Sequence, residues 1–365
     1  MNQDAKDLIY LIYCGLNSIV PDKSRIDDID LDAIIKLASK HMVYGTVATA
    51  LKNASIDNLC ILNKIAQTQR KEIILNNDID QIVASFETYG IWYMLLKGAV
   101  IKNLYPHLGM REMADVDILI DENRADDVRN ILNNQGFKIK SFGNNNVDSY
   151  IKSPLTHIEI HRTLFGFQHD RLYYDYFRNI KDRLIKDNDN SFGYHFSNED
   201  FYIYYLVHEY KHYSIKGTGL RSLMDTYLIL KNYNIDFNYV NREIALLGLV
   251  EFESKIRELS TLIFESGEYA NNDILEYIVN SGAFGNLDNL VNNRINRSKG
   301  GKLKYLIRRL FGITDGNYWE YLNQRHPVFY RYKVLLPFLP LYRLIYGIYK
   351  YPKRLKEEFK SVMRK

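Results

Sequence analysis

The chain has 365 residues, of which 46% are hydrophobic and 25% charged, and this ordinary globular composition excludes a disordered or fibrous protein. The formal charge is +4, and two cysteines are too few for a disulfide framework or a thiolate zinc site. Cys14 and Cys60 lie in apolar helical patterns, so two buried free thiols are expected. The N-terminal stretch carries acids where an export signal would carry bases, and a cytoplasmic location is expected.

The charge is unevenly distributed along the chain. Residues 299–365 hold 16 Lys/Arg and 4 Asp/Glu, a net of +12, whereas residues 1–298 hold 32 and 40, a net of −8. Such a basic segment either meets an anionic partner or docks on the acidic body. Its apolar residues recur close to the helical period, and docking on the body is the favoured expectation. Peripheral contact with an anionic membrane surface is the alternative, and nucleic acid is a less favoured partner.

Helical periodicity dominates the start of the chain. Residues 5–53 predict two helices, the second opened by Asp27 and Asp28. A long helix is expected from Leu59 to Tyr89, where Gly90 ends it.

Short apolar and alternating runs then predict a small sheet. The expected strands are IWYMLL (91–96), DVDILID (115–121), FKIKSF (137–142), VDSYIK (147–152) and THIEIHR (156–162). One short helix is expected after Gly98 and another over about 122–134.

The helical period returns from about residue 197, where Ser197 has the position and residue type of an N-cap. Further helices are expected to about residue 280, followed by an Asn- and Gly-rich boundary over 280–301. The predicted organisation is a helical region (1–89), a catalytic core (90–165), a helical domain (166–298) and a basic, aromatic segment (299–365).

DVDILID carries acids at alternating positions. Because alternate residues of a strand share a face, Asp115, Asp117 and Asp121 are expected on one face and Val116, Ile118 and Ile120 on the other. Paired carboxylates resist joint ionisation unless a cation lies between them, which indicates a hard metal such as magnesium. An exposed acidic strand face is the alternative. The polar face of THIEIHR would consist of His157, Glu159 and His161, and a third acid there would allow a second ion.

The segment LLKGAV precedes the acidic strand. Gly98 permits close backbone approach, Lys97 adds positive charge, and Arg111 lies four residues before the first acid. These residues are predicted to position a triphosphate, against the alternative of a solvated basic surface.

HEYKH (208–212) matches H-E-x-x-H, the pattern of zinc peptidases. The longer form of that motif requires glycine and histidine where this chain has Ile215 and Thr218, so zinc proteolysis is a distant alternative. In a helix, His208 and His212 would instead share a face. Arg221 and Asp225 would share a face of the next helix.

The segment LLKGAVIKNLYPHLGMREMADVDILID, followed by HIEIHR, HEYKH and GLRSLMD, resembles the uncharacterised bacterial nucleotidyltransferases of the polymerase-β superfamily, often encoded near surface-polysaccharide genes. The resemblance covers roughly residues 60–350. It implies an α+β fold, with a polymerase-β-like core of small mixed sheet flanked by N- and C-terminal helical regions. It also implies transfer of a nucleoside monophosphate from an NTP such as ATP to an acceptor hydroxyl, with release of pyrophosphate.

By this resemblance, two Mg²⁺ or Mn²⁺ ions would be held by Asp115, Asp117 and Glu159, and Glu159 would assist deprotonation of the acceptor. A cross-strand salt bridge is the structural alternative for Glu159. The resemblance also suggests further supporting and nucleotide-binding residues. These are His161, Arg221, His208, His212 and Asp225, with an internal polar network as the alternative.

One residue departs from the family pattern. The superfamily's phosphate loop commonly reads Gly-Ser, but Gly98 is followed here by Ala99. The missing hydroxyl motivates a rival interpretation, a nucleotide-binding or regulatory relative with little or no turnover.

Overall fold

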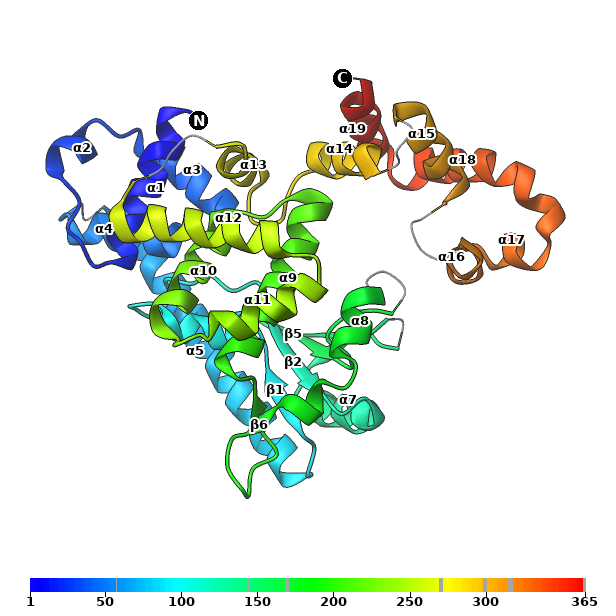
Figure 1. Ribbon diagram of the computed structural model, residues 1–365, viewed down its shortest axis with the longest axis horizontal. Coiled ribbons are helices and arrows are strands. Elements are labelled where there is room, and N and C mark those ends of the chain that lie inside the picture. The colour runs from blue at the N-terminus through cyan, green and yellow to red at the C-terminus, as the bar shows by residue number, and fades with distance from the viewer. Residues whose placement is uncertain are drawn as a thin grey trace.

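The computed structural model describes residues 1–56, 58–143, 145–167, 171–268, 272–297, 301–313 and 318–363. Within these ranges the fold is mixed α+β, as the sequence predicts, with one five-stranded sheet inside a largely helical protein (Figure 1). A separate two-stranded ribbon joins β6 (Ile185–Lys186) to β7 (Tyr194–His195).

The main sheet has the strand order β1-β2-β5-β4-β3. Only β2 and β5 pair in parallel, and the other neighbours are antiparallel. Every predicted strand is present; β4 has the predicted bounds, and the other four strands are shorter than predicted. The strands are β1 (Tyr93–Leu95), β2 (Val116–Ile120), β3 (Lys138–Ser141), β4 (Val147–Lys152) and β5 (Thr156–His161).

The N-terminal region contains four helices, so the prediction of two is wrong. They are α1 (Gln3–Leu16), α2 (Lys23–Asp27), α3 (Leu31–His41) and α4 (Tyr44–Asn53). The physical reason is local capping. Asp22 accepts a hydrogen bond from the Ser24 N–H and starts α2, while Asp30, not the earlier aspartates, accepts from the Ala33 N–H and starts α3.

The long predicted helix is α5 (Leu59–Thr88), which lies along the sheet in Figure 1. The buried Asp78 carboxylate fastens it there by accepting hydrogen bonds from Lys152 of β4 and Thr156 of β5. Cys60 corrects one expectation: its thiol is exposed near the start of α5, 3.7 Å from the Tyr44 hydroxyl, because this first turn is only partly covered.

Short helices connect the strands. They are α6 (Gly98–Ile101), η1 (Lys102–Leu104), η2 (Glu122–Arg124) and α7 (Ala125–Asn134), followed after the sheet by α8 (Arg171–Phe177) and η3 (Ile180–Arg183).

The helical domain begins with α9 (Asn198–Lys216), and Ser197 accepts a hydrogen bond from the Asp200 N–H as its predicted N-cap. This helix is buried along its first half, where its aromatic residues join the main core. The domain continues with α10 (Leu220–Asn232), α11 (Phe237–Leu246), α12 (Val250–Thr261), η4 (Leu262–Ser266) and α13 (Asp273–Ser281).

The C-terminal part of the chain forms an arm that projects from the body (Figure 1). The helix before the arm, α14 (Leu287–Arg297), lies within the stretch expected to be a boundary and packs against α9. The arm comprises α15 (Gly301–Phe311), α16 (Tyr318–Arg325), α17 (Pro327–Arg331), η5 (Lys333–Phe338), α18 (Leu339–Lys350) and α19 (Pro352–Met363).

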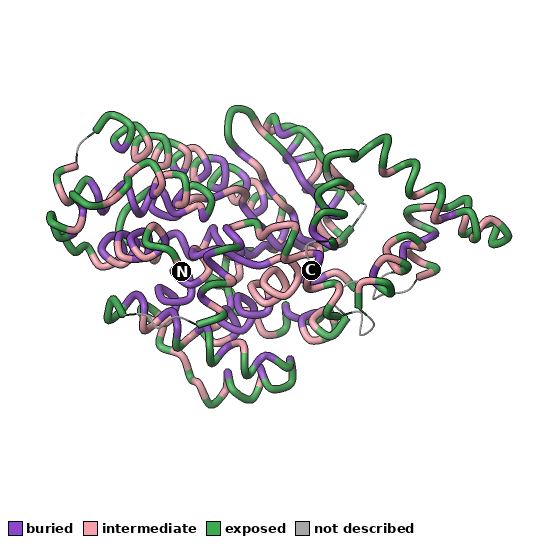
Figure 2. The backbone as a smooth tube through the Cα atoms, turned by 90° about the horizontal axis from the view of Figure 1, so that it is seen from above, coloured by how far each residue is buried: buried purple, intermediate pink, exposed green. Residues whose placement is uncertain are grey.

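The expectation that the basic segment docks on the acidic body is wrong for most of its length. Among the described residues, the arm helices pack chiefly on one another and on α14, around a small core of Val291, Tyr305 and Val362. Figure 2 shows that the body is rich in buried residues whereas the arm is mainly exposed. None of the described helices has the length and apolar character needed to cross a lipid bilayer.

Candidate active site

The acids of β2 and β5 converge at one end of the sheet. In the parallel register, Asp117 lies opposite Glu159 and their side chains share a face, because Val116 and Ile158 before them face the buried core. Asp115 immediately precedes β2. Asp121 lies beyond the other end of β2, where it caps η2. Asp115 and Asp121 therefore lie at opposite ends of β2, and only Asp115 is near Asp117 and Glu159.

Two overlapping groups of side chains have ligand atoms close enough together to bind a metal ion. The first is Asp115, His157 and Glu159, the second is Asp117, Glu159 and His161, and within each set the atoms lie within 4.8 Å of one another. Glu159 belongs to both sets. Burial, together with the nearby Asp117 and Asp115 carboxylates, raises the pKa of Glu159 to about 7. The cluster thus holds excess negative charge that a hard cation would neutralise.

Asp117 is the buried centre of this cluster. Its Oδ1 accepts hydrogen bonds from Lys97 Nζ at 2.8 Å and from His161 Nε2 at 2.6 Å. Burial opposes ionisation of Asp117, but the Lys97 charge and the His161 hydrogen bond outweigh it and hold the pKa well below its usual range. Burial and the Lys97 charge lower the pKa of His161. Because an ionised carboxylate can only accept, the hydrogen bond to Asp117 requires a proton on His161 Nε2.

The loop between β1 and α6 positions Lys97. Lys97 has a positive φ of 45°, unusual for a residue with a side chain. Gly98 follows, and a Cβ at that position would lie 2.4 Å from the Arg111 Nη1 atom and 2.8 Å from the Met113 sulfur. The glycine is therefore required for close packing of the loop on Arg111. In the structure the Lys97 ammonium contacts Asp117, and its role toward a triphosphate stays a prediction.

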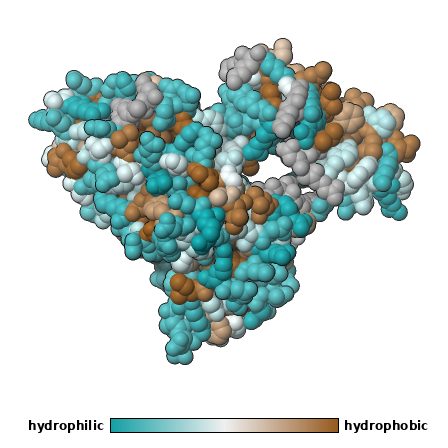
Figure 3. Space-filling model, viewed as in Figure 1, coloured by the Kyte–Doolittle hydropathy of each residue, from teal (hydrophilic) through white to brown (hydrophobic). Residues whose placement is uncertain are grey.

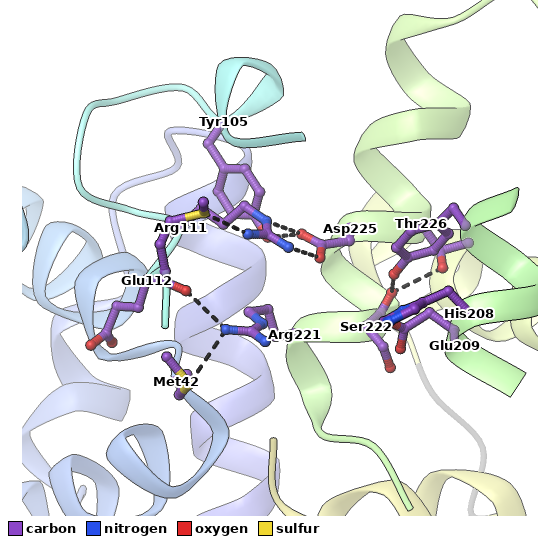
Figure 4. A network of polar contacts seen from close by, with 12 residues as sticks. Met42, Tyr105, Arg111, Glu112, His208, Glu209, Arg221, Ser222, Asp225 and Thr226 are labelled. Atoms are coloured by element: carbon purple, nitrogen blue, oxygen red, sulfur yellow. Dashed lines mark hydrogen bonds and ion pairs between the residues drawn. The ribbon is translucent and has the colours of Figure 1, made fainter. Parts of the chain in front are cut away.

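Arg111 joins the region of the sheet to α10 of the helical domain (Figure 4). Its Nε and Nη2 atoms donate to the two carboxylate oxygens of Asp225 on α10, at 2.9 and 2.7 Å, and the Tyr105 hydroxyl donates to the same carboxylate at 2.7 Å. All three side chains are buried. The guanidinium faces Asp225, so a structural role is visible here, whereas phosphate binding by Arg111 stays a prediction.

Arg221 lies one turn before Asp225 and contacts the segment that leads into β2. Its Nη1 atom donates to the Glu112 carbonyl oxygen at 2.9 Å and lies 3.4 Å from the Met42 sulfur. Nucleotide binding by Arg221 was predicted from the sequence. The structure places it on the cavity wall, and this role also remains a prediction.

The two histidines of HEYKH contact each other. His208 and His212 share a face of α9, as predicted, with their Nε2 atoms 3.1 Å apart. Burial is the main reason that the pKa of His208 lies well below its usual value and that of His212 falls to about 4. Neither histidine belongs to the metal-capable sets found among the described residues. The arrangement favours a neutral polar pair over a zinc peptidase site.

The core and the helical domain enclose a cavity of about 320 Å³. It is lined by Asp115, Asp117 and Glu159 from the sheet side and by His208, His212 and Arg221 from the helices. Lys97, Gly98, Arg111 and Asp225 also line it, so every predicted site residue except His161, which is buried behind Asp117, reaches this space. The sequence interpretation missed Glu209, Tyr205 and the loop Lys216–Gly219; the glutamate of HEYKH was noticed only as part of a zinc motif.

Glu209 is a partly buried carboxyl group on the helical wall. Its side chain is 18% exposed, and its Oε1 lies 3.6 Å from His208 Nδ1. Burial and the neighbouring Asp225 carboxylate raise its pKa to about 7 from an ordinary 4.5. Because the folded state holds this proton more tightly than the unfolded state, stability is unaffected below about pH 4.5 and falls as pH rises toward 7.

Replacing Glu209 by glutamine should therefore stabilise the protein at alkaline pH. We expect the free energy of unfolding of Glu209→Gln to exceed that of wild type by about 1–3 kcal/mol at pH 8 and to differ little near pH 4.5. Urea denaturation at the two pH values measures this difference. Glu265→Gln, at an exposed position, is the matched control and should change neither value. An equal effect of Glu209→Gln at both pH values would contradict the buried-acid interpretation.

Comparisons with known proteins bear on the family to which the chain belongs. A family model described as "Uncharacterised nucleotidyltransferase" matches residues 27–265, a range that includes the whole sheet and all predicted site residues. Neither the curated proteins nor the solved structures gave a match. Because the family model covers more than half of the chain, this protein belongs to the uncharacterised nucleotidyltransferase family.

Proposed function

We propose that the protein transfers a nucleoside monophosphate from an NTP to an acceptor hydroxyl, using two Mg²⁺ or Mn²⁺ ions held by Asp115, Asp117 and Glu159. The observation that carries the proposal is the parallel register that sets Asp117 beside Glu159, with Asp115 at the strand entrance and a cavity in front of them. Carboxylate oxygens in this number suit hard divalent cations, and the ions would supply charge neutralisation at the phosphate.

The reaction is a substitution at the α-phosphorus. The acceptor oxygen forms a bond to that phosphorus, the bond to the β-phosphate oxygen breaks, and pyrophosphate leaves with the electron pair. We assign uptake of the hydroxyl proton to Glu159 in its ionised form. Lys97 and Arg111 line the same cavity. We assign triphosphate binding to Lys97 because its ammonium group contacts Asp117, one of the proposed metal ligands.

The acceptor would lie against the helical wall. Glu209, Ser222 and Thr218 offer hydrogen-bonding groups there, which suits a hydroxyl-bearing compound better than an apolar one. We propose sugars and lipid-linked sugars of polysaccharide biosynthesis as the first acceptors to test. We also propose a cytoplasmic location, where NTPs are available.

Pyrophosphate release tests the proposal directly. The full-length protein is incubated with each NTP and with Mg²⁺ or Mn²⁺. The acceptors are sugars, sugar phosphates, lipid-linked sugars, RNA and a small-molecule cell extract. We expect release in at least one combination, and its loss when a chelator removes the divalent ions. Adding the divalent ion back should restore the rate, which separates metal removal from denaturation.

A second candidate function rests on Ala99. Ala99 occupies the position where the superfamily's phosphate loop commonly has serine, and alanine supplies no hydroxyl beside Gly98. Its side chain is only 2% exposed and packs in the hydrophobic core that includes the strands. A nucleotide-binding relative without turnover would bind NTP in calorimetry yet release pyrophosphate no faster than Asp117→Asn in every combination. That outcome would reject the transferase proposal.

A further inference from the structure

The arm carries a stripe of uncovered apolar side chains. Val334 and Phe338 of η5 are 79% and 63% exposed, and Leu341, Ile345 and Ile348 of α18 are 58%, 59% and 56% exposed. The three α18 residues recur at the spacing of one helix face. Figure 3 shows hydrophobic side chains gathered over the far end of the arm. A contiguous apolar surface of this kind indicates a binding partner.

Basic side chains accompany the stripe. Arg331 and Lys333 lie just before it and Lys350 and Lys353 just after it, all exposed. Few acids oppose them, since residues 299–365 contain four, and Glu358 is already engaged by Arg309 Nε at 2.7 Å and the Tyr305 hydroxyl at 2.6 Å. The arm therefore presents a strongly positive surface around an apolar centre.

Tyrosines complete the surface. Tyr342 and Tyr346 of α18 stack with ring centroids 5.9 Å apart, and Tyr349 is 89% exposed. Tyrosine rings with one apolar and one polar end are favoured at the boundary between hydrocarbon and water. The combination of apolar stripe, basic flanks and tyrosines is typical of helices that lie in a membrane interface.

We propose that the arm, α15–α19, binds the surface of an anionic lipid bilayer. Leu341, Ile345 and Ile348 would enter the head-group boundary, and Lys350 and Lys353 would contact anionic head groups. Since no described helix can span a bilayer, the contact is peripheral. This inference concerns a surface remote from the acids of the cavity and stands independently of the proposed transfer reaction.

Other occupants fit the surface less well. A second copy would bring one segment of net +12 against another, which is electrostatically unfavourable. A nucleic acid would satisfy the basic residues, but its phosphate surface offers nothing to the apolar stripe. An anionic bilayer is the partner that satisfies both features.

Vesicle flotation tests the proposal with the full-length protein. Vesicles of phosphatidylcholine alone are compared with vesicles containing about one third phosphatidylglycerol, at low and high salt. We expect flotation only with the anionic vesicles, and its loss at high salt. Leu341→Ser/Ile345→Ser and Lys350→Glu/Lys353→Glu should each weaken binding about tenfold or more.

Matched variants on the body control for general effects. Leu246→Ser/Val250→Ser changes two apolar residues that are 65% and 52% exposed, and Lys23→Glu/Lys36→Glu reverses two exposed charges. Both should float like wild type. Circular dichroism checks that every variant retains its helices.

Three results would overturn the proposal. One is the absence of flotation with anionic vesicles, and another is equal flotation by the arm and body variants. The third is that the protein does not float but instead forms a dimer or binds nucleic acid, and that the arm variants abolish this dimer or this binding. The surface would then have a different occupant.

Discussion

Asp117→Asn is expected to reduce nucleotidyl transfer by about 10³-fold, because it removes one charge from the proposed metal site at the point where β2 and β5 meet. The asparagine oxygen can still accept the hydrogen bonds of Lys97 and His161, so the site should keep its shape. Pyrophosphate release at saturating NTP and Mg²⁺ measures the effect. Metal titration should show weaker activation by the divalent ion.

Two neighbouring aspartates provide the controls. Asp121→Asn alters the same seven-residue segment, but Asp121 caps η2 outside the cavity, so transfer should be unchanged. Asp115→Asn lies at the strand entrance outside the Lys97 and His161 network, and it should impair transfer without disturbing that ion pair. Full activity in Asp117→Asn, or equal loss in Asp121→Asn, would remove the basis for assigning the metal to this end of the sheet.

Arg111→Met should destabilise the folded protein by about 3–5 kcal/mol. The substitution leaves the Asp225 carboxylate buried beside Tyr105 without its cationic partner, and an uncompensated buried charge is costly. Urea denaturation at neutral pH measures the free energy of unfolding. The variant should also lose transfer activity, because Arg111 packs against the Gly98 loop.

A surface ion pair gives the comparison. Arg124→Met removes a partner of Asp127, but these side chains are 35% and 53% exposed, so the cost should not exceed about 1 kcal/mol. The double variant Arg111→Met/Asp225→Leu should be less destabilised than the sum of the two single variants, since no charge is left unpaired. Additive effects would show that the two residues do not act as a pair.

The sheet and the position of its acids could be predicted from the sequence because strand periodicity is a local property. In DVDILID and THIEIHR the apolar residues determine the buried face, and the acids must then occupy the opposite one. The family resemblance implied a small mixed sheet with Glu159 as the third acid, but the parallel register that brings Asp117 beside Glu159 is known only from the structure. Local sequence likewise predicted the Ser197 cap and the shared helix face of His208 and His212, and both are present in the structure.

The remaining features depend on contacts that local patterns do not encode. Arg111 and Asp225 lie 114 residues apart, and neither residue's surroundings reveal that it is buried. The four-helix N-terminus was missed because several neighbouring aspartates have the residue type of an N-cap, and the structure shows that Asp22 caps a separate α2 while Asp30 caps α3. For the arm, helical periodicity correctly indicated an apolar face, but periodicity cannot say whether the protein's own body covers it.

The Lys97–Asp117 contact has a consequence for the order in which substrates load. Because the Lys97 ammonium already neutralises the Asp117 carboxylate, a divalent ion that entered the proposed site would have to displace the ammonium, and the affinity for the ion would be lowered by the loss of that ion pair. A triphosphate offers the displaced ammonium a new anion, so ion and nucleotide should favour each other's binding, reciprocally. Lys97 would thus lower the affinity of the acid cluster for free divalent cations and favour cations that bind together with a nucleotide.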